Sequence, residues 1–153
     1  MMTINTFNKL TGQETLHPLV CIADLTKDKL DADINKPCNF YALVCNGEKL
    51  RLIIPGETFR IPAAKNKREF GYTGGLFHPD LLCDTPLETD IMSYRCRCNC
   101  HKKLCDNEKK SIHDCIGLIA HELKHSIDRY SSTIIVSQIK LLLNCCTRIC
   151  CNN

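Results

Sequence analysis

The residues of this sequence best suited to chemistry are His121, Glu122 and His125, which form an H-E-x-x-H pattern. On an α-helix, two histidines four positions apart project from the same side, so their imidazoles can share one Zn²⁺ ion at about 2.0–2.1 Å. The glutamate points to one flank, where its carboxylate can take a proton from a zinc-bound water. On the same helix, Asp128 would lie within about 60° of both histidines. One helix face would then offer three metal-ligating side chains to a cleft.

The element that must position these residues is a long helix, predicted from Ser111 to about Tyr130. Ser111 is suited to the N-cap, with Asp114 three residues later as a weak form of the capping box. Arg129 lies in the last turn, where a cation suits the helix dipole. The apolar side chains fall within about 80° of one another on the face opposite the histidines. They are Ile112, Ile116, Ile119, Leu123, Ile127 and Tyr130. The alternative interpretation is a surface helix whose histidines lie on an ordinary solvated face.

The segment from Asp114 to Tyr130 resembles the active-site helix of the zincin metallopeptidases. The extended form His121-Glu122-Leu123-Lys124-His125-Ser126-Ile127-Asp128 is similar to two subgroups. One is the family that processes an ATP-synthase subunit precursor in mitochondria, and the other is the small metallopeptidase effectors and toxins of bacteria. The resemblance implies that this helix packs under a twisted sheet whose edge strand holds a peptide substrate. It also implies hydrolysis of protein or peptide bonds by a Zn²⁺-activated water.

By this resemblance, His121 and His125 are the first two zinc ligands and Glu122 is the general base. No glutamate follows Glu122 in the chain, so a downstream glutamate ligand is excluded. Asp128 is the expected third ligand, with a second-shell role that holds a histidine tautomer as the alternative. Other candidates for the third ligand are His101, His113 or a cysteine, and His113 faces away from His121 by about 80°. Tyr130, Tyr94 and Arg129 are available to stabilise the oxyanion.

The N-terminal half is predicted to carry the β-structure. Residues 40–45 and 48–54 flank Asn46-Gly47, which is typical of a type I′ hairpin turn. Further short strands are expected at 19–23, 58–61 and 90–96, and a short helix at 26–34. The glycines and prolines of residues 62–88 predict a loop. After the long helix, residues 133–144 are expected to form a second helix, with a strand as the alternative.

Thirteen cysteines are the one abnormal feature of the composition. Four of them, with His101, fall between Cys96 and Cys105, in a spacing that matches no common zinc finger. On a strand, Cys96, Cys98 and Cys100 would share one face. A metal site, disulfides and no joint role are equally supported for this segment, and any of them could involve the cysteines of the C-terminus. These are Cys145, Cys146, Cys150 and Cys151.

The length and composition predict one domain, and the expected strands and helices make it α+β. The resemblance implies that it is a small zincin-like domain over residues 1–144, followed by an irregular cysteine-rich tail over 145–153. A net charge of +3 and 6% aromatic residues give no reason to expect a nucleic-acid partner. No signal peptide or transmembrane segment is expected, which favours the cytoplasm or a specialised secretion or import route. The predicted function is a zinc endopeptidase. The alternatives are a cysteine-rich interaction module, stabilised by metal or disulfides, and a peptidase that has lost turnover.

Overall fold

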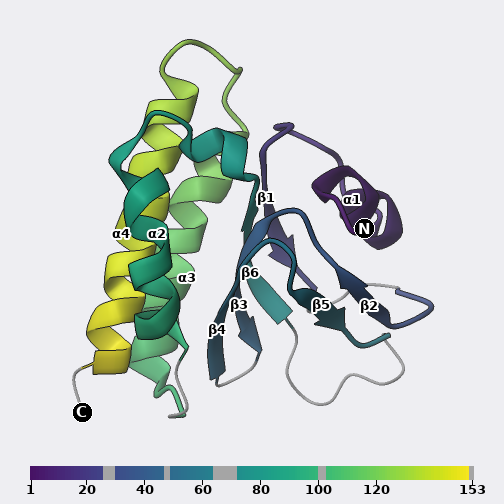
Figure 1. Cartoon of the computed structure of the whole chain (residues 1–153), viewed down its shortest axis with the longest axis horizontal. Coiled ribbons are helices and arrows are strands. Elements are labelled where there is room, and N and C mark those ends of the chain that lie inside the picture. Colours follow the sequence, from purple (N-terminus) through teal and green to yellow (C-terminus); the bar gives the residue numbers. More distant parts are fainter. Residues whose placement is uncertain (26–29, 47–48, 64–71, 100–102, 152–153) are drawn as a thin grey trace.

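The computed structural model describes residues 1–25, 30–46, 49–63, 72–99 and 103–151. It confirms the α+β class: helices pack on antiparallel sheets, and a helix ends the described chain (Figure 1). The larger sheet has the strand order β1-β6-β3-β4, with β1 at Val20–Asp24, β3 at Tyr41–Asn46, β4 at Lys49–Ile53 and β6 at Tyr72–Phe77. The smaller sheet pairs β2 (Ile34–Pro37) with β5 (Thr58–Ile61).

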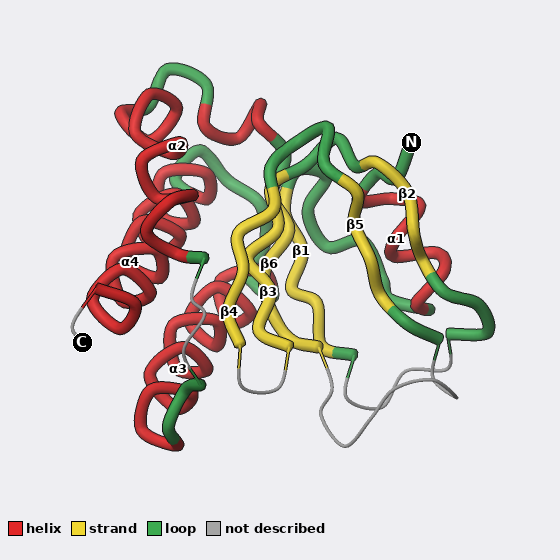
Figure 2. The backbone as a smooth tube through the Cα atoms, turned by 60° about the horizontal axis from the view of Figure 1, so that its bottom comes forward, coloured by secondary structure: helices red, strands yellow, loops and turns green. Residues whose placement is uncertain are grey.

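The larger sheet lies between two layers of the molecule (Figure 2). Helices α2 (Pro86–Cys98), α3 (Asp106–Leu123) and α4 (Ser131–Cys151) cover one face, and their apolar residues share a core with Val20, Leu43 and Leu52 of the sheet. Helix α1 (Ile4–Thr11) and the smaller sheet pack on the other side, with Phe7, Phe40 and Phe59 in edge-to-face contact. Because side chains alternate along each strand, one strand contributes to both cores.

The predicted hairpin is confirmed as β3 and β4, which pair antiparallel from Ala42–Ile53 to Asn46–Lys49. Its Asn-Gly turn lies partly outside the described residues. The strand expected at 19–23 is confirmed as β1, and the one at 58–61 is confirmed as β5. The short helix expected at 26–34 lies partly outside the described residues, and Ile34 begins strand β2 instead. Helix α1 was not predicted, although Thr3 caps it by accepting a hydrogen bond from the Thr6 amide.

The loop predicted for residues 62–88 includes residues 64–71, which lie outside the described ranges. From Tyr72 on the prediction is wrong, because β6 is an inner strand of the larger sheet. Its glycines suggested a loop, but Gly74 has a specific role between neighbouring strands. A Cβ atom at Gly74 would overlap the carbonyl oxygen of Leu43 on β3. Glycine is therefore required here for close approach of two backbones rather than for a turn. A short 3₁₀ helix, η2 (Pro79–Leu82), follows β6.

The strand predicted for residues 90–96 is also wrong, because these residues belong to helix α2. Pro86 occupies the first turn, where its missing amide costs nothing, and Arg95 and Arg97 lie in the last turn. The side chains that α2 buries recur at helical spacing: Leu87, Ile91, Tyr94 and Cys98. Cys98 consequently points into the helical core and not along one face of a strand.

The irregular tail predicted for residues 145–153 is replaced, as far as Cys151, by the continuation of α4. Cys146 and Ile149 are buried there, so this segment belongs to the same core as the rest of the chain. By length and composition α4 is long and apolar enough to cross a membrane, a property that core helices of globular proteins share. In this structure α4 packs along α2 and α3.

Candidate functional site

Helix α3 carries the first part of the H-E-x-x-H pattern and ends inside it. The helix runs to Leu123, and the amides of Lys124 and His125 bond to the carbonyls of His121 and Glu122, three residues back. Such bonds tighten the last turn of a helix and end it. The prediction of a continuous helix to Tyr130 is therefore wrong. Ile127 and Tyr130, expected in the core, are 59% and 55% exposed.

The other two predicted ligands lie in the connection between α3 and α4. His125 is exposed, and its Nδ1 atom lies 2.8 Å from the carbonyl oxygen of Ser126. Asp128 caps α4: its Oδ1 atom accepts a hydrogen bond from the Tyr130 amide at 2.9 Å, and Ser131 is its second partner. A carboxylate at the first turn of a helix is stabilised by the free amides and the helix dipole. This local bonding competes with a role as metal ligand.

The predicted zinc site requires three protein donors at about 2.0–2.2 Å from one ion. Within the described ranges, no group of three or more histidine, cysteine, aspartate or glutamate side chains is arranged to hold a metal ion. His121, His125 and Asp128 all fall in these ranges, so the described structure does not bring them together. The spacing rule fails because it assumes helix geometry throughout, and the helix ends at Leu123. His101 lies outside the described residues, and His113 is exposed on α3.

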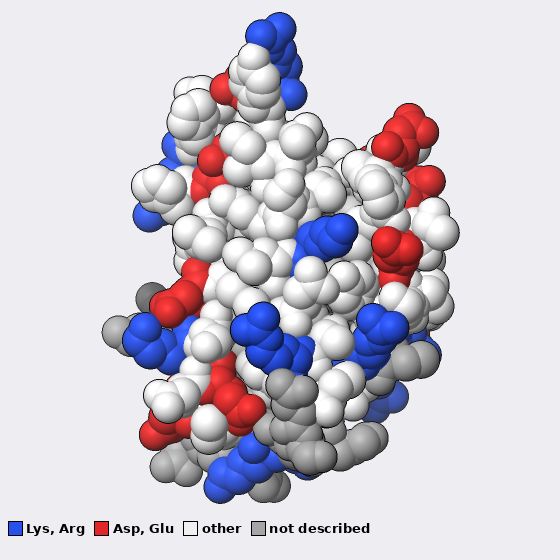
Figure 3. All heavy atoms as spheres, turned by 90° about the vertical axis from the view of Figure 1, so that its left-hand side faces the viewer, with Lys and Arg blue, Asp and Glu red and all other residues white. Residues whose placement is uncertain are grey.

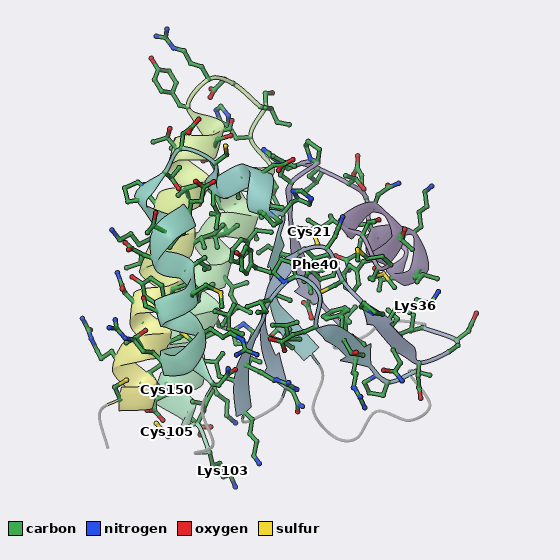
Figure 4. The ribbon with its side chains drawn as sticks, in the orientation of Figure 1. Cys21, Lys36, Phe40, Lys103, Cys105 and Cys150 are labelled. Carbon is green, nitrogen blue, oxygen red and sulfur yellow. The ribbon has the colours of Figure 1, made fainter. Side chains whose placement is uncertain are left out.

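A cavity of about 130 Å³ adjoins the end of α3. On one side it is lined by Ala120, Leu123 and Lys124, of which the last two belong to the H-E-x-x-H pattern. On the other side, strand β1 and the segment before it contribute the lining residues Gln13, Glu14, Leu16, Val20, Cys21 and Ile22. The lining is mostly apolar. Burial raises the pKa of Cys21, labelled in Figure 4, to about 12, so this thiol is not a nucleophile near neutral pH.

The segment that leads into β1 is held by a buried histidine. His17 is 5% exposed, and its Nδ1 atom accepts a hydrogen bond from the Leu19 amide at 3.0 Å. Burial lowers the pKa of His17, because a buried imidazolium loses its hydration. The neutral ring is also the form that can accept the amide hydrogen bond. His17 thus anchors the chain between two lining residues of the cavity, Leu16 and Val20.

Four cysteines of the helical layer form two pairs across helices. The Sγ atom of Cys115 on α3 lies 3.6 Å from that of Cys145 on α4. Cys146, the next residue of α4, forms a hydrogen-bonded thiol pair with Cys98 of α2, and both are completely buried. This bond lowers the pKa of Cys98 and raises that of Cys146. Cys150, near the lower end of α4 in Figure 4, is disulfide-bonded.

Sequence reasoning missed two features of this region. The first is the start of α4, which Asp128 and Ser131 mark with a D-x-x-S pattern typical of a helix N-terminus. The second is the cavity, for which the sequence carries no signal, because its two sides are about a hundred residues apart.

The charged residues around these elements include both signs. Figure 3 shows lysine and arginine side chains interspersed with aspartate and glutamate over the face formed by α2 and α4, with an uncharged area between them.

At the inner side of α2, Arg95 binds the Glu57 carboxylate, and Asn99 accepts a hydrogen bond from the Leu52 amide of β4 at 3.0 Å. These contacts attach the helical layer to the sheets.

No protein-family model matches this sequence, and no curated protein is significantly similar to it.

Proposed function

We propose that this chain is a cysteine-stabilised interaction module that binds an extended peptide along strand β1. The observation that carries the proposal is the cavity between this strand and the end of α3. An extended peptide can add a strand to the edge of a sheet. Backbone hydrogen bonds then supply affinity, and pockets for its side chains supply specificity. The proposal needs no metal ion.

Strand β1 has the geometry of a docking edge. Of the described strands only β6 pairs with it, in an antiparallel register from Val20–Phe77 to Asp24–Thr73. The His78 amide donates to the Leu19 carbonyl, so residues 19 and 78 are a hydrogen-bonded pair. Bonded and non-bonded pairs alternate in antiparallel sheets. The backbone groups of Val20 and Ile22 therefore point away from β6, toward the edge of the described sheet, where Val20 is 2% exposed and Ile22 is partly exposed.

The volume of the cavity favours a side chain over a free small molecule. Sites for drug-sized ligands have about 300–1,000 Å³, well above the 130 Å³ found here. A space of this size suits one apolar side chain of a bound peptide. Glu14 and Lys124 among the lining residues would contact polar groups that flank it.

The test begins with selection of binders from a phage-displayed library of random dodecapeptides, followed by affinity measurement on a labelled synthetic peptide. Leu16→Glu places a charge at the cavity, and Leu10→Glu is the matched control, since Leu10 on α1 is 49% exposed and Leu16 is 44% exposed. We expect Leu16→Glu to weaken binding by about tenfold or more, equivalent to about 1.4 kcal/mol, and Leu10→Glu to leave it within about twofold.

A second measurement tests the backbone pairing. Methylation of alternate amide nitrogens of the peptide should abolish binding in one register and spare it in the other, because only every second amide faces the strand. The proposal is wrong if no peptide is enriched, if both leucine variants bind equally, or if the two methylation registers have the same effect.

The zinc endopeptidase function stays a second proposal. One observation favours it: Leu123 and Lys124 of the H-E-x-x-H pattern line the same cavity, so a peptide on β1 would lie beside the pattern. It requires His121, His125 and Asp128 to hold Zn²⁺, with Glu122 as general base, in an arrangement that differs from the described one.

Calorimetric titration with Zn²⁺ tests this second proposal. A zinc ligand role predicts stoichiometric binding that is lost in His121→Ala and retained in the control His113→Ala. Peptidase activity should then disappear in Glu122→Gln with zinc still bound. Equal zinc binding by His121→Ala and the parent protein would exclude the metal site without affecting the peptide-binding proposal.

A further inference from the structure

The helical layer contains a thiol pair close enough to react. Cys115 and Cys145 lie on neighbouring helices with their Sγ atoms 3.6 Å apart, and both are free thiols. A disulfide needs a sulfur–sulfur distance of about 2.03–2.05 Å, so the sulfurs must approach by about 1.5 Å. Rotation of the two side chains about their Cα–Cβ bonds can move the sulfurs by a distance of this size. We propose that Cys115 and Cys145 form a reversible disulfide that joins α3 to α4.

The two thiols differ in access, and this sets the order of reaction. Cys145 is partly exposed, whereas Cys115 is 7% exposed. Burial, followed by the interaction with Cys145, raises the pKa of Cys115 to about 11. The thiolate is the attacking form, and an external reagent must reach it. Cys145 therefore reacts first with an oxidant from solution, and Cys115 completes the bond.

The neighbouring pair, Cys98 and Cys146, provides a contrast in the same helix. Both thiols are 0% exposed, and the Cys98 sulfur also lies within hydrogen-bonding distance of the Leu143 carbonyl and the Thr147 hydroxyl. These contacts hold the Cys98–Cys146 pair inside the core, out of reach of a solvent-borne reagent. The exchange chemistry is thus assigned to Cys145 and not to the adjacent Cys146.

The oxidant is a small disulfide such as oxidised glutathione. The Cys145 thiolate attacks one sulfur of glutathione disulfide, which forms a mixed disulfide and releases one glutathione thiolate. The Cys115 thiolate then attacks the Cys145 sulfur, forms the protein disulfide and releases the second glutathione. Two protein thiols are oxidised and one glutathione disulfide is reduced to two thiols, and the two protons lost by the protein are carried by the glutathiones.

The disulfide would close a covalent loop from Cys115 to Cys145, and this loop contains the connection between α3 and α4. The enclosed residues include Leu123 and Lys124 of the cavity and the whole H-E-x-x-H pattern. The oxidised protein would therefore hold the middle of α3 against the C-terminal part of α4. This inference does not depend on peptide binding or on a metal ion.

Peptide mapping tests the inference on the full chain. The protein is equilibrated with oxidised and reduced glutathione at several ratios, free thiols are blocked with N-ethylmaleimide, and trypsin digestion follows without reduction. Cleavage after Lys110, Lys124, Lys140 and Arg148 gives peptide 111–124, with Cys115 as its one cysteine, and peptide 141–148, with Cys145 and Cys146. We expect these two peptides to be linked under oxidising conditions and separate under reducing ones.

Cysteine-to-serine variants identify which two cysteines form the disulfide. The link should disappear in Cys145→Ser and persist in Cys146→Ser and in Cys83→Ser, an exposed cysteine of the η2–α2 connection that serves as control. In Cys115→Ser, Cys145 should accumulate a glutathione adduct, whereas Cys115 should carry none in Cys145→Ser. An absent link in the wild-type protein at every ratio, or a link that depends on Cys146, overturns the proposal. The peptide map of the wild-type protein tests the proposal even if a cysteine variant fails to fold.

Discussion

Asp128 and Ser131 bond to each other reciprocally at the start of α4: the Asp128 amide donates to the Ser131 hydroxyl oxygen at 2.9 Å, and that hydroxyl donates to the Asp128 carboxylate at 3.3 Å. The same carboxylate accepts the Tyr130 amide. Together these bonds satisfy backbone and side-chain groups that would otherwise be left open where the helix begins. They also give Asp128 a structural role that needs no metal ion.

The first prediction concerns this cap. Replacing Asp128 by Ala should lower the free energy of unfolding by about 1 kcal/mol, the usual cost of losing an N-terminal cap. Urea denaturation of the variant and the wild-type protein in the presence of EDTA measures this loss of stability. Asp114→Ala is the control, because Asp114 makes an exposed i, i+4 ion pair with Lys110, which contributes about 0.3–0.5 kcal/mol. A loss for Asp128→Ala that appears only when zinc is added would instead identify Asp128 as a metal ligand.

The second prediction concerns Gly74. Gly74→Ala should destabilise the protein by about 3 kcal/mol or more, since the new methyl group overlaps the Leu43 carbonyl and the strands must separate. Gly117→Ala is the matched control: nothing lies within 4 Å of a Cβ there, and Gly117 is inside α3. That substitution should stabilise the protein by up to about 1 kcal/mol, because alanine is the better helix former. Comparable effects of the two substitutions would contradict the position of β6 in the sheet.

The third prediction follows from His17. Its pKa is lowered in the folded protein by burial, so between the folded and the unfolded values the unfolded chain binds more protons. Stability therefore rises with pH in that window. The contribution of neutral His17 to the free energy of unfolding is complete above the unfolded pKa of about 6.5. This contribution is lost progressively as the pH falls below that value. Protonation also removes the acceptor of the Leu19 amide bond.

Urea denaturation at pH 5.5 and pH 7.5 checks the role of His17. The wild-type protein should lose more stability on acidification than His17→Gln. The exposed residue His113 provides the control, and His113→Gln should retain the wild-type difference. An unchanged difference in His17→Gln would show that other groups cause the pH dependence.

The fourth prediction quantifies the Cys115–Cys145 bond. A disulfide that closes a loop of about 30 residues should stabilise the folded state by about 3–4 kcal/mol in the chain-entropy model. The measurement compares wild type and Cys145→Ser, each under oxidising and reducing conditions, so that the effect of other disulfides cancels. We expect the difference between the two proteins to be about 3–4 kcal/mol when oxidised and below about 1 kcal/mol when reduced. Equal differences in both conditions would leave the bond without a role in stability.

Where a structural element depended on neighbouring residues in the chain, the sequence was a sufficient guide. The alternating strands around Asn46-Gly47 predicted the β3–β4 hairpin, whose pairing is local. The isoleucines at 112, 116 and 119 predicted the buried face of α3, because a helix repeats every 3.6 residues wherever it forms. Together with the helix expected after residue 133, these patterns determined the α+β class.

Other features depended on contacts between distant residues. The glycines of β6 indicate a loop by composition, and only the proximity of Leu43 explains why Gly74 belongs in a central strand. Lys124, His125 and Ser126 are all compatible with a helix, so nothing local marks the end of α3 at Leu123. The bonds of Asp128 to the first turn of α4 compete with extension of α3 and with metal binding.

The sequence by itself thus determined the fold class, the hairpin, the buried face of α3 and which side chains are chemically able to bind a metal or form disulfides. Tertiary structure decided which of those side chains meet. It separated His125 and Asp128 from the helix of His121, and it placed Cys115 against Cys145 and Leu16 against Leu123 across one cavity. The physical reason is that periodicity describes one element at a time, whereas a site forms from the packing of elements that are far apart in the chain.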